Sequence, residues 1–229
     1  MKSDKNPLKN LKPAILTAIV VFIIVTLVAL WAARQLPPDI KLPVHWNVNG
    51  EPDRYAGKFL GLFMMPIVIL GITALLTFVP RMEPRQKHIK MSMKAYNIII
   101  IGLVLVFATL HVVIIMNALG KPFSIEKIVP ALIGFLFIVI GNFMGKVRSN
   151  YMLGIKTPWT LSSEISWNKT HRLGGWLFVI TGCLIVLTSL VSSGKNTMFV
   201  LLIGVFGTVI VTFVYSYIIW KRDPDKLMK

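Results

Sequence analysis

The chain has 229 residues, of which 55% are hydrophobic, yet it carries 25 Lys and Arg against 9 Asp and Glu, a formal net charge of +16. A composition that is both this apolar and this basic excludes most soluble globular, disordered and collagen-like chains. The single cysteine, Cys183, excludes an internal disulfide framework and a multi-cysteine metal cluster. The class of the protein therefore depends on how the apolar and the basic residues are segregated along the chain.

Six long apolar runs follow one another, and none of them contains Asp, Glu, Lys or Arg. Each has roughly the length of about 20 residues that a helix needs to cross about 30 Å of hydrocarbon. Because unpaired backbone amides are too costly in lipid and no alternating ten-residue pattern appears, helices are predicted rather than a barrel. No small-residue cleavage site follows the first run, so we expect it to stay as an anchor. The runs are Ala14–Ala33, Phe59–Val79, Ala95–Asn117, Ile128–Met144, Gly174–Ser192 and Thr197–Ile219.

The basic residues alternate between the segments that connect these runs. The N-terminus, the second and fourth loops and the C-terminus hold 18 of the 25 Lys and Arg, whereas the other three loops hold 7. By the positive-inside rule the richer side is cytoplasmic. We interpret the charge as an orientation signal in contact with anionic lipid headgroups, because no nucleic-acid-binding motif accompanies it. The predicted fold is thus an all-α polytopic membrane protein with six transmembrane helices and both termini cytoplasmic.

The first external loop, Arg34 to Lys58, is longer than topology alone requires. Three prolines exclude a helix over its first half, and Val44–Val48 followed by Asn49-Gly50 predicts a short strand that enters a tight turn. We expect a small extracellular cap whose polar and aromatic side chains are suited to holding a peptide or a small ligand. The alternative is a folded cap whose aromatic rings lie in the interfacial belt of the membrane. The side chains in question are those of His45, Trp46, Asn47, Asp53 and Tyr55.

The internal loop between the fourth and fifth runs, Gly145 to Leu173, is rich in tryptophan. Thr157 before Pro158 predicts a helix start, because proline is tolerated at the first helical position and threonine caps free amides. Ser162 before Glu164 is a second capping signal. A short helix from about Pro158 to His171 is therefore predicted.

This predicted helix has two unlike sides. Leu161 and Ile165 fall on one of them, while Glu164, Asn168 and His171 share a polar stripe. With basic residues near an anionic leaflet, we expect a Trp-rich cytoplasmic interfacial segment that lies along the membrane surface with its tryptophans half buried. The alternative is a membrane-seated linker with a surface Glu–His or Glu–Arg pair.

Two acid–histidine pairs invite an enzymatic or metal-binding interpretation. Glu164 and His171 stand one to two helical turns apart, and His45 and Asp53 share the external loop. The predicted topology places these pairs on opposite membrane faces, and each alone offers too few ligands for a metal site. No nucleophile, Walker or HExxH pattern supports a reaction. The sequence therefore predicts no catalytic residue, no metal and no cofactor.

A few small or polar residues lie within the apolar runs. His111 is the only histidine inside a run, and a packed, hydrogen-bonded histidine is favoured over a proton relay. Gly141 and Gly145 form a GxxxG spacing, and Gly204 and Gly207 offer a second close-approach surface. We expect these glycines to pack helices within one bundle, with a homodimer as the alternative.

Two stretches resemble known families. LPVHWNVNGEPDRYAGK is similar to the motif of a small bacterial membrane domain of unknown function. GNFMGKVRSNYMLGIKTPWTLSSEISWNKTHRLGGWLF closely resembles the hallmark of the SdpI family of immunity membrane proteins. The resemblance implies a multi-pass protein of the bacterial plasma membrane that protects its host from a secreted antimicrobial peptide, the SDP-type killing factor. It also implies a receptor that draws a DNA-binding autorepressor to the membrane and so raises its own expression.

The resemblance marks residues on both sides of the membrane. On the outside it adds Pro43 and Gly50 to the residues of the cap, so the toxin-binding candidates are His45, Trp46, Asn47, Gly50, Asp53 and Tyr55. On the inside it marks Gly141, Gly154 and Gly175 together with the partner-docking candidates, which are Asn142, Arg148, Asn150, Thr157, Pro158, Trp159, Thr160, Glu164, Trp167, Thr170, His171 and Arg172. The expected partners are membrane lipids, a secreted peptide toxin and a cytoplasmic repressor, with no direct contact to nucleic acid.

The chain is predicted to begin with a basic N-terminus at 1–13, followed by the first two spans with the external loop at 14–80 and a basic loop at 81–94. An SdpI-like region follows at 95–220, with its motif at 141–178, and the tail is 221–229. A small transporter or an envelope enzyme acting on a peptide or lipid is the alternative function. The absence of Asp, Glu, Lys and Arg from the six runs speaks against transport, and leaves His111 as the sole candidate relay.

Overall fold

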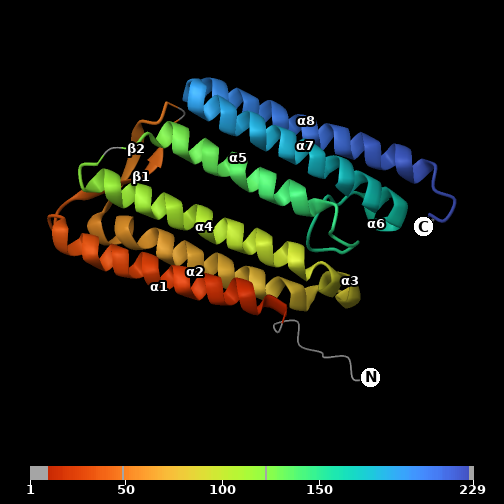
Figure 1. The fold of residues 1–229 in the computed structure, drawn as a ribbon, viewed down its shortest axis with the longest axis horizontal. Helices are drawn as coiled ribbons and strands as arrows, with labels where there is room; N and C mark the ends of the chain where they lie inside the picture. The colour runs from red at the N-terminus through yellow and green to blue at the C-terminus, as the bar shows by residue number, and fades with distance from the viewer. Residues whose placement is uncertain (1–9, 48, 122, 227–229) are drawn as a thin grey trace.

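The computed structural model describes residues 10–47, 49–121 and 123–226. Within these ranges six long helices run side by side, each long and apolar enough to cross a membrane (Figure 1). They are α1 (Lys12–Gln35), α2 (Lys58–Met82), α4 (Met93–Ala118), α5 (Ile125–Met144), α7 (Glu164–Val191) and α8 (Gly194–Lys221). The remaining elements are short: α3 (Gln86–Met91), α6 (Pro158–Ser162), β1 (Lys41–Trp46) and β2 (Pro52–Gly57). The predicted six-helix fold is confirmed.

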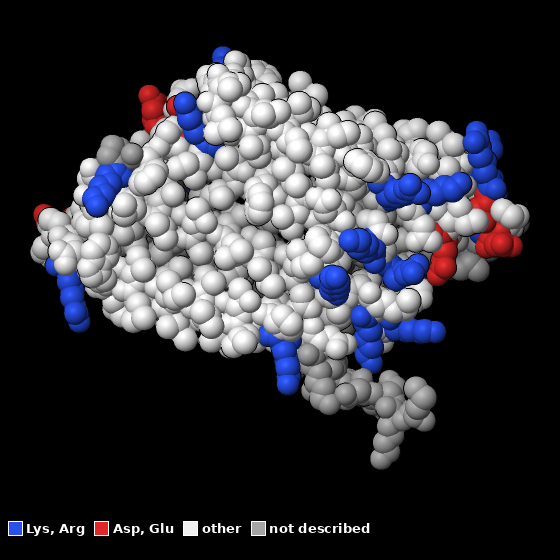
Figure 2. Space-filling view, viewed as in Figure 1, with Lys and Arg blue, Asp and Glu red and all other residues white. Residues whose placement is uncertain are grey.

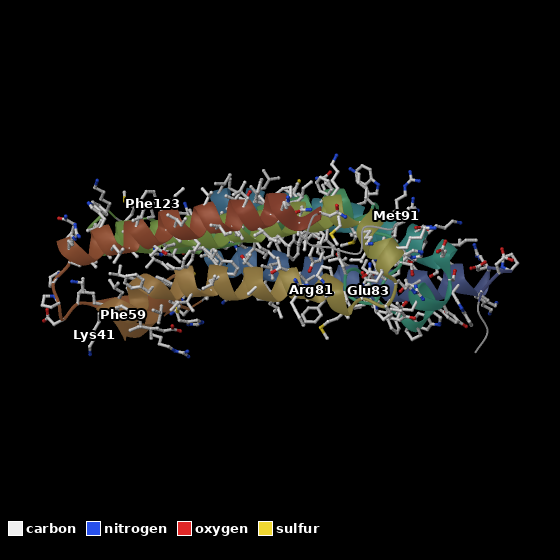
Figure 3. All side chains as sticks on the ribbon, turned by 90° about the horizontal axis from the view of Figure 1, so that it is seen from below. Lys41, Phe59, Arg81, Glu83, Met91 and Phe123 are labelled. Atoms are coloured by element: carbon white, nitrogen blue, oxygen red, sulfur yellow. The ribbon has the colours of Figure 1, made fainter. Side chains whose placement is uncertain are left out.

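The two ends of the bundle differ in what they carry. The hairpin of β1 and β2 lies at one end, here called the outer end, and the start of α1, the end of α8, α3 and α6 lie at the other, the inner end (Figure 1). Charged side chains gather toward both ends and leave uncharged surface between them (Figure 2). Lys41, Phe59 and Phe123 lie toward the outer end, and Arg81, Glu83 and Met91 toward the inner end (Figure 3). The assignment of the inner end to the cytoplasm remains a prediction from charge. The predicted cytoplasmic segments at 1–9 and 227–229 lie outside the described part of the chain.

The helices form two groups of three. Helices α1, α2 and α4 pack on one another around a buried core that includes Val25, Ile69 and Ile100, while α7 packs against both α5 and α8. The two groups meet along α4 and α5. Much of the outward surface is apolar and exposed, as at Leu16 and Ile203. Such a surface is costly in water and favourable in hydrocarbon, as expected of spanning helices.

Glycines bring the backbones of α5 and α7 into direct contact. A Cβ atom added to Gly134 would lie 2.7 Å from the carbonyl oxygen of Gly182, and one added to Gly182 would lie 2.5 Å from that of Gly134. Gly141 and Gly175 face each other in the same reciprocal way, at 2.5 and 2.7 Å. Without a hydrophobic driving force between helices in lipid, close packing of small residues is a main source of helix association. These two pairs therefore fix α5 onto α7.

The other glycines expected to pack helices fall into two classes. Gly204 faces Thr181 of α7, so a Cβ there would meet its methyl group at 2.3 Å. In contrast, Gly207 has no neighbour within 4 Å of an added Cβ, and Gly145 meets only the Cα of Arg172 at 3.8 Å. The close-approach surface thus uses one residue of each predicted pair. The packing partners lie within this chain, as expected.

His111 is packed and hydrogen-bonded, as predicted. Its side chain is buried on α4, and its Nε2 donates to the carbonyl oxygen of Val25 on α1 at 2.9 Å. A buried polar group in lipid needs such a partner. The histidine therefore ties α4 to α1.

The predicted interfacial helix from Pro158 to His171 is wrong. Residues 158–162 form the single-turn helix α6, and α7 begins directly afterwards at Glu164 and continues to Val191. Thr157 caps α6 as predicted, but the cap of α7 is Ser163 rather than Ser162. Trp167, Thr170 and His171 instead lie buried in the first turns of α7 beneath residues 145–157, whereas Glu164 and Asn168 stay exposed.

We predict that Gly141→Ala destabilises the bundle by about 1 to 3 kcal/mol, because the new methyl group overpacks the contact with Gly175. Gly207→Ala is the matched control, since it adds the same methyl group to a helix where nothing lies within 4 Å. Thermal unfolding of both variants in detergent measures the difference. Equal stability of the two variants would contradict the assignment of the glycine contact.

Candidate functional site

The external loop folds as an irregular β-hairpin. Strands β1 and β2 pair antiparallel from Lys41 and Gly57 to Trp46 and Pro52, with register shifts on either side of His45. The predicted strand therefore begins three residues earlier than expected, and its last residue, Val48, lies outside the described part. The register shifts bring His45 beside Asp53, whose Oδ1 accepts a hydrogen bond from Nδ1 of the ring at 2.6 Å.

Asn47 holds the turn of the hairpin together. Its Oδ1 accepts from the backbone N–H groups of Asn49 at 2.9 Å and of Glu51 at 3.1 Å. Its Nδ2 donates to the Glu51 carboxylate at 2.9 Å, and its backbone pairs with Glu51 and Gly50. Asparagine favours turns because its short side chain can satisfy backbone groups in this way. The role of Asn47 here is to shape the turn.

The hairpin is seated on two helices. At its root, Leu42 is buried against Gly61 of α2, where an added Cβ would meet the leucine side chain at 2.6 Å. At its tip, Gly50 has a φ of +77°, and an added Cβ would lie 2.7 Å from Cβ of Glu126 on α5. Only glycine combines this backbone conformation with so close an approach. The hairpin thus bridges the two groups of helices at the outer end.

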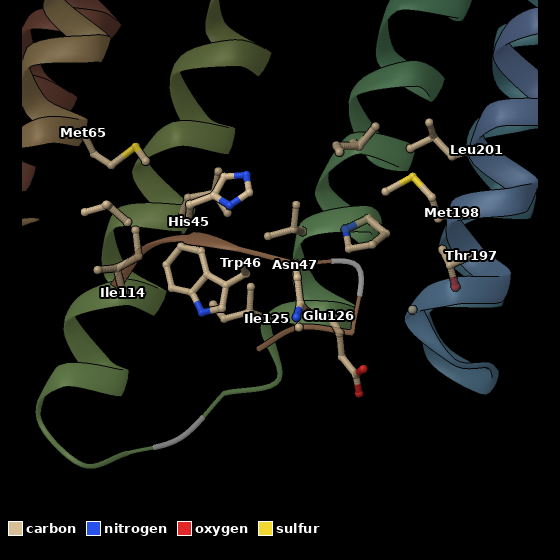
Figure 4. Close-up of a pocket in the computed structure, with 17 residues that line it drawn as sticks. His45, Trp46, Asn47, Met65, Ile114, Ile125, Glu126, Thr197, Met198 and Leu201 are labelled. Carbon is tan, nitrogen blue, oxygen red and sulfur yellow. The ribbon is translucent and has the colours of Figure 1, made fainter. Parts of the chain in front are cut away.

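Beneath the hairpin lies a cavity of about 350 Å³, here called the outer groove (Figure 4). Its walls come from β1, α2, α4, α5 and α8, and they include His45, Trp46 and Asn47 from the predicted candidates. Asp53 and Tyr55 do not line it; Asp53 reaches it only through His45, and Tyr55 is exposed on the second strand. The structure therefore brings together four of the six external candidates, since Gly50 also lines the groove.

Glu126 is the site residue that sequence reasoning missed. It lies in the first turn of α5, lines the outer groove and also lines a second cavity of about 380 Å³ whose walls include Pro43 and Phe123. The available signal was a single acid among the residues that connect the third and fourth apolar runs. An acid in the first turn of a helix is also favourable for the helix dipole, so this signal alone was not specific.

At the inner end, residues 145–157 wrap around the start of α7. The buried Trp167 ring donates from Nε1 to the carbonyl oxygen of Val147 at 2.8 Å and stacks on His171 with the ring centroids 3.9 Å apart. His171 accepts from the N–H of Ile155 through Nε2 at 2.9 Å and donates from Nδ1 to the carbonyl oxygen of Trp167 at 2.8 Å. These two bonds require the neutral imidazole with its proton on Nδ1.

Gly154 allows this wrap to close over the rings. Its φ is +119°, and an added Cβ would lie 2.3 Å from Nε2 of His171 and 3.2 Å from the Trp167 ring. The next residue then directs its N–H at His171. Gly154 is therefore required twice, for its backbone conformation and for the space above the imidazole.

A chain of hydroxyl groups ties α6 and α7 to α8. Thr157 and Thr160 form a capping box, and Oγ1 of Thr157 lies 3.0 Å from Oγ of Ser216 on α8. Ser166 on α7 donates to the backbone oxygen of Ser216 at 2.8 Å. Trp159 packs its ring edge against Phe213. Buried hydroxyl groups need such partners, so these residues specify how the three helices meet.

The same inner loop is anchored to the other group of helices. Glu83, after α2, is buried and accepts from the N–H groups of Arg85 at 2.8 Å and of Tyr151 at 2.9 Å. Arg85 donates to the hydroxyl of Ser149 and, at 3.1 Å, to the carbonyl oxygen of Leu161. Sequence reasoning missed both residues. Their signal was a Glu and an Arg directly after an apolar run, a pattern shared with many surface loops.

The structure separates the internal candidates by exposure. Glu164 is exposed whereas His171 is fully buried, so these two do not form the acid–base pair considered from the sequence. Within the described residues, no group of three or more His, Cys, Asp or Glu is placed to hold a metal ion. The buried candidates are Asn150, Thr157, Thr160, Trp167, Thr170 and His171; the exposed ones are Asn142, Arg148, Pro158, Glu164 and Arg172, with Trp159 half buried.

Comparisons with known proteins agree with the two segments singled out by the sequence. Residues 146–216 match the model of the SdpI/YfhL protein family, and residues 20–70 match a domain of unknown function (DUF1648). The chain is also similar to the Immunity protein SdpI of Bacillus subtilis (strain 168), at 26% identity over 190 residues, which cover 82% of this chain and 87% of that protein. No solved structure matches. The resemblance to the SdpI family is thus confirmed, and with its six spanning helices the chain is a multi-pass bacterial membrane protein.

We predict that Gly154→Ala opens the inner loop, because the methyl group collides with His171. Gly120→Ala is the matched control, since Gly120 also has a positive φ, of +78°, but nothing within 4 Å of an added Cβ. The expected result is faster tryptic cleavage after Arg148 and Lys156 in the first variant only. Equal cleavage of both variants would show that the close approach of Gly154 to His171 does not hold this loop closed.

Proposed function

We propose that this chain is a membrane immunity protein that protects a bacterium against a secreted antimicrobial peptide of the SDP type. The supporting observation is its similarity to the Bacillus subtilis immunity protein over 82% of its length, together with the family match that covers the inner loop, α7 and most of α8. A role of this kind needs a surface that meets the peptide at the membrane. The outer groove and the hairpin above it supply a candidate for that surface.

The outer groove suits a hydrophobic peptide for physical reasons. A ligand site is typically a cavity of about 300 to 1,000 Å³ with apolar walls and a few placed polar groups. The outer groove, of about 350 Å³, fits this description, with Trp46 as its largest aromatic side chain and His45 and Asn47 as polar groups of the hairpin. Tryptophan gives much apolar contact area and one hydrogen-bond donor, a combination that is typical of binding hot spots. We infer that engagement of the toxin takes place here and that the role is non-enzymatic.

We further propose that the inner end acts as the docking surface for a cytoplasmic autorepressor. The buried candidates of the inner loop are used in holding α6, α7 and α8 together, so a partner would meet the exposed ones. Arg148, Glu164 and Arg172 are the charged members of that exposed set. Charged side chains on a surface set the selectivity and rate of association more than its strength.

The immunity role predicts that Trp46→Ala lowers survival of cells challenged with the peptide toxin, because it removes the aromatic wall of the outer groove. Truncation of a buried aromatic anchor typically costs about 2 kcal/mol or more, which is about 30-fold or more in affinity. Trp31→Ala is the matched control, because that ring is 52% exposed on α1 and lies outside the groove. Both variants are compared at equal abundance in the membrane. Full protection by Trp46→Ala would overturn the proposed site.

The docking role predicts that Glu164→Gln with Arg172→Gln lowers the share of the repressor found in the membrane fraction after toxin is added. Both side chains are exposed, so stability should change little. Lys195→Gln, an exposed charge at the outer end, is the control. A membrane-bound share that stays the same with and without toxin in the unmodified protein would remove the signalling half of the proposal.

A further inference from the structure

The outer groove has a floor and two sides, and the hairpin lies over its outer end. Helices α4 and α5 form the floor, and α2 and α8 flank it (Figure 4). It lies where α4 of one group of helices packs against α5 of the other. Because its flanking helices carry exposed apolar side chains, as at Ile67 and Phe199, the groove faces the same surroundings as the spanning helices do.

The outer groove reaches below the level of the hairpin. Leu110 lies eight residues before the end of α4, and Ile133 lies eight residues after the start of α5. At about 1.5 Å per residue these side chains stand about 12 Å inside the helix ends. The hydrocarbon core is about 30 Å thick. The groove therefore extends to the depth of the outer leaflet, and an occupant reaches it sideways from the membrane.

The chemistry of the groove changes along its length. Its deeper wall is apolar and includes Met65, Met198 and Leu201. Methionine side chains are flexible and adapt to irregular apolar shapes. The polar groups, His45, Asn47 and Glu126, are gathered at the hairpin end. An occupant that matches this pattern is apolar along its body and polar at one end.

The Glu126 carboxylate is a charge that remains available at the hairpin end of the outer groove, here called its mouth, and it points away from the apolar wall (Figure 4). The Asp53 carboxylate accepts from His45, and the Glu51 carboxylate accepts from Asn47. For the Glu126 carboxylate, by contrast, no hydrogen bond or ion pair with another described residue is found, although its stem packs under Gly50. An opposite charge close to a partly desolvated carboxylate is favourable, and a phosphate is not. The mouth therefore favours a cation over an anionic lipid headgroup.

We propose that the outer groove binds an apolar segment of a membrane-inserted peptide and that a basic side chain of this peptide pairs with Glu126. This inference rests on the proposed immunity function and specifies the chemistry of its ligand. The apolar body occupies the wall formed by Met65, Met198 and Leu201, while the hairpin residues cover it from above. A lipid acyl chain is the competing occupant.

The test uses the full chain in phosphatidylcholine vesicles, with the single native cysteine removed by Cys183→Ser. A bimane label is attached at Met198→Cys in the groove or, as the control, at Phe206→Cys, an exposed position on α8 outside it. The probe is a leucine-rich peptide of about 20 residues with one lysine near its outer end. A matched peptide carries glutamine in place of the lysine.

We expect the lysine peptide to change the fluorescence at position 198 in a saturable way and to leave position 206 unchanged. Replacement of the lysine, or Glu126→Gln in the protein, should each weaken the apparent affinity about fivefold, as for one partly exposed ion pair. The two changes together should weaken it no further, because both remove the same pair. Equal responses at the two positions, or affinities that do not depend on the charges, would overturn the proposal. A response at position 198 to brominated lipid that the peptide fails to reverse would assign the groove to an acyl chain.

Three variants separate this inference from the proposed function: Trp46→Ala, Glu126→Gln and Met198→Trp, which places a larger side chain in the apolar wall of the groove. If Trp46→Ala abolishes protection of cells while Glu126→Gln and Met198→Trp protect fully, the immunity function stands and the peptide pairing in the groove is wrong. If Trp46→Ala protects fully while the charge dependence appears in vesicles, the groove binds such peptides and the immunity function at this site is wrong.

Discussion

The backbone contact between α5 and α7 is the constraint on which both candidate sites depend. Gly134 with Gly182 and Gly141 with Gly175 allow the two helices to approach so closely that no side chain fits between them. Fixed in this way, α5 presents its outer end to the hairpin and its inner end to the loop that wraps α7. Both segments that the sequence singled out are therefore positioned by one helix pair.

The inner segment shows how a motif can serve folding first. Trp167 and His171 use their polar atoms on the carbonyl oxygens of Val147 and Trp167 and on the N–H of Ile155. A loop that enters the end of a bundle brings backbone groups into a place with little water, and each needs a partner. The buried polar residues supply these partners. Any contact with a partner at this end would therefore be made by the side chains that remain exposed.

The sequence predicts features that depend on length or local chemistry, and it fails where distant segments meet. Run lengths predicted the six spans, prolines with Asn49-Gly50 predicted the first strand of the hairpin and its turn, and Thr157 predicted the cap of α6. The stripe of Glu164, Asn168 and His171 predicted a surface helix because periodicity cannot show that residues 145–157 cover His171 while the other two stay exposed. The outer groove could not be predicted from the sequence either, because α2 and α8, which flank it, are far apart in the chain and its walls are ordinary apolar residues.

The charged residues of the chain have two separate roles, one in the orientation of the protein and one in the proposed binding of a ligand. Most Lys and Arg residues mark the predicted cytoplasmic side, and this large excess says nothing about a ligand. A single acid at the outer end indicates more about a ligand than the net charge does, because binding depends on the charged side chains that are free to form an ion pair. Asp53 and Glu51 are engaged within the hairpin, whereas Glu126 lies at the mouth of the groove. In a protein with a formal net charge of +16, a negative group at the entrance to an apolar groove selects for basic hydrophobic ligands at close range, because screening limits the reach of the surrounding positive charge to about 10 Å.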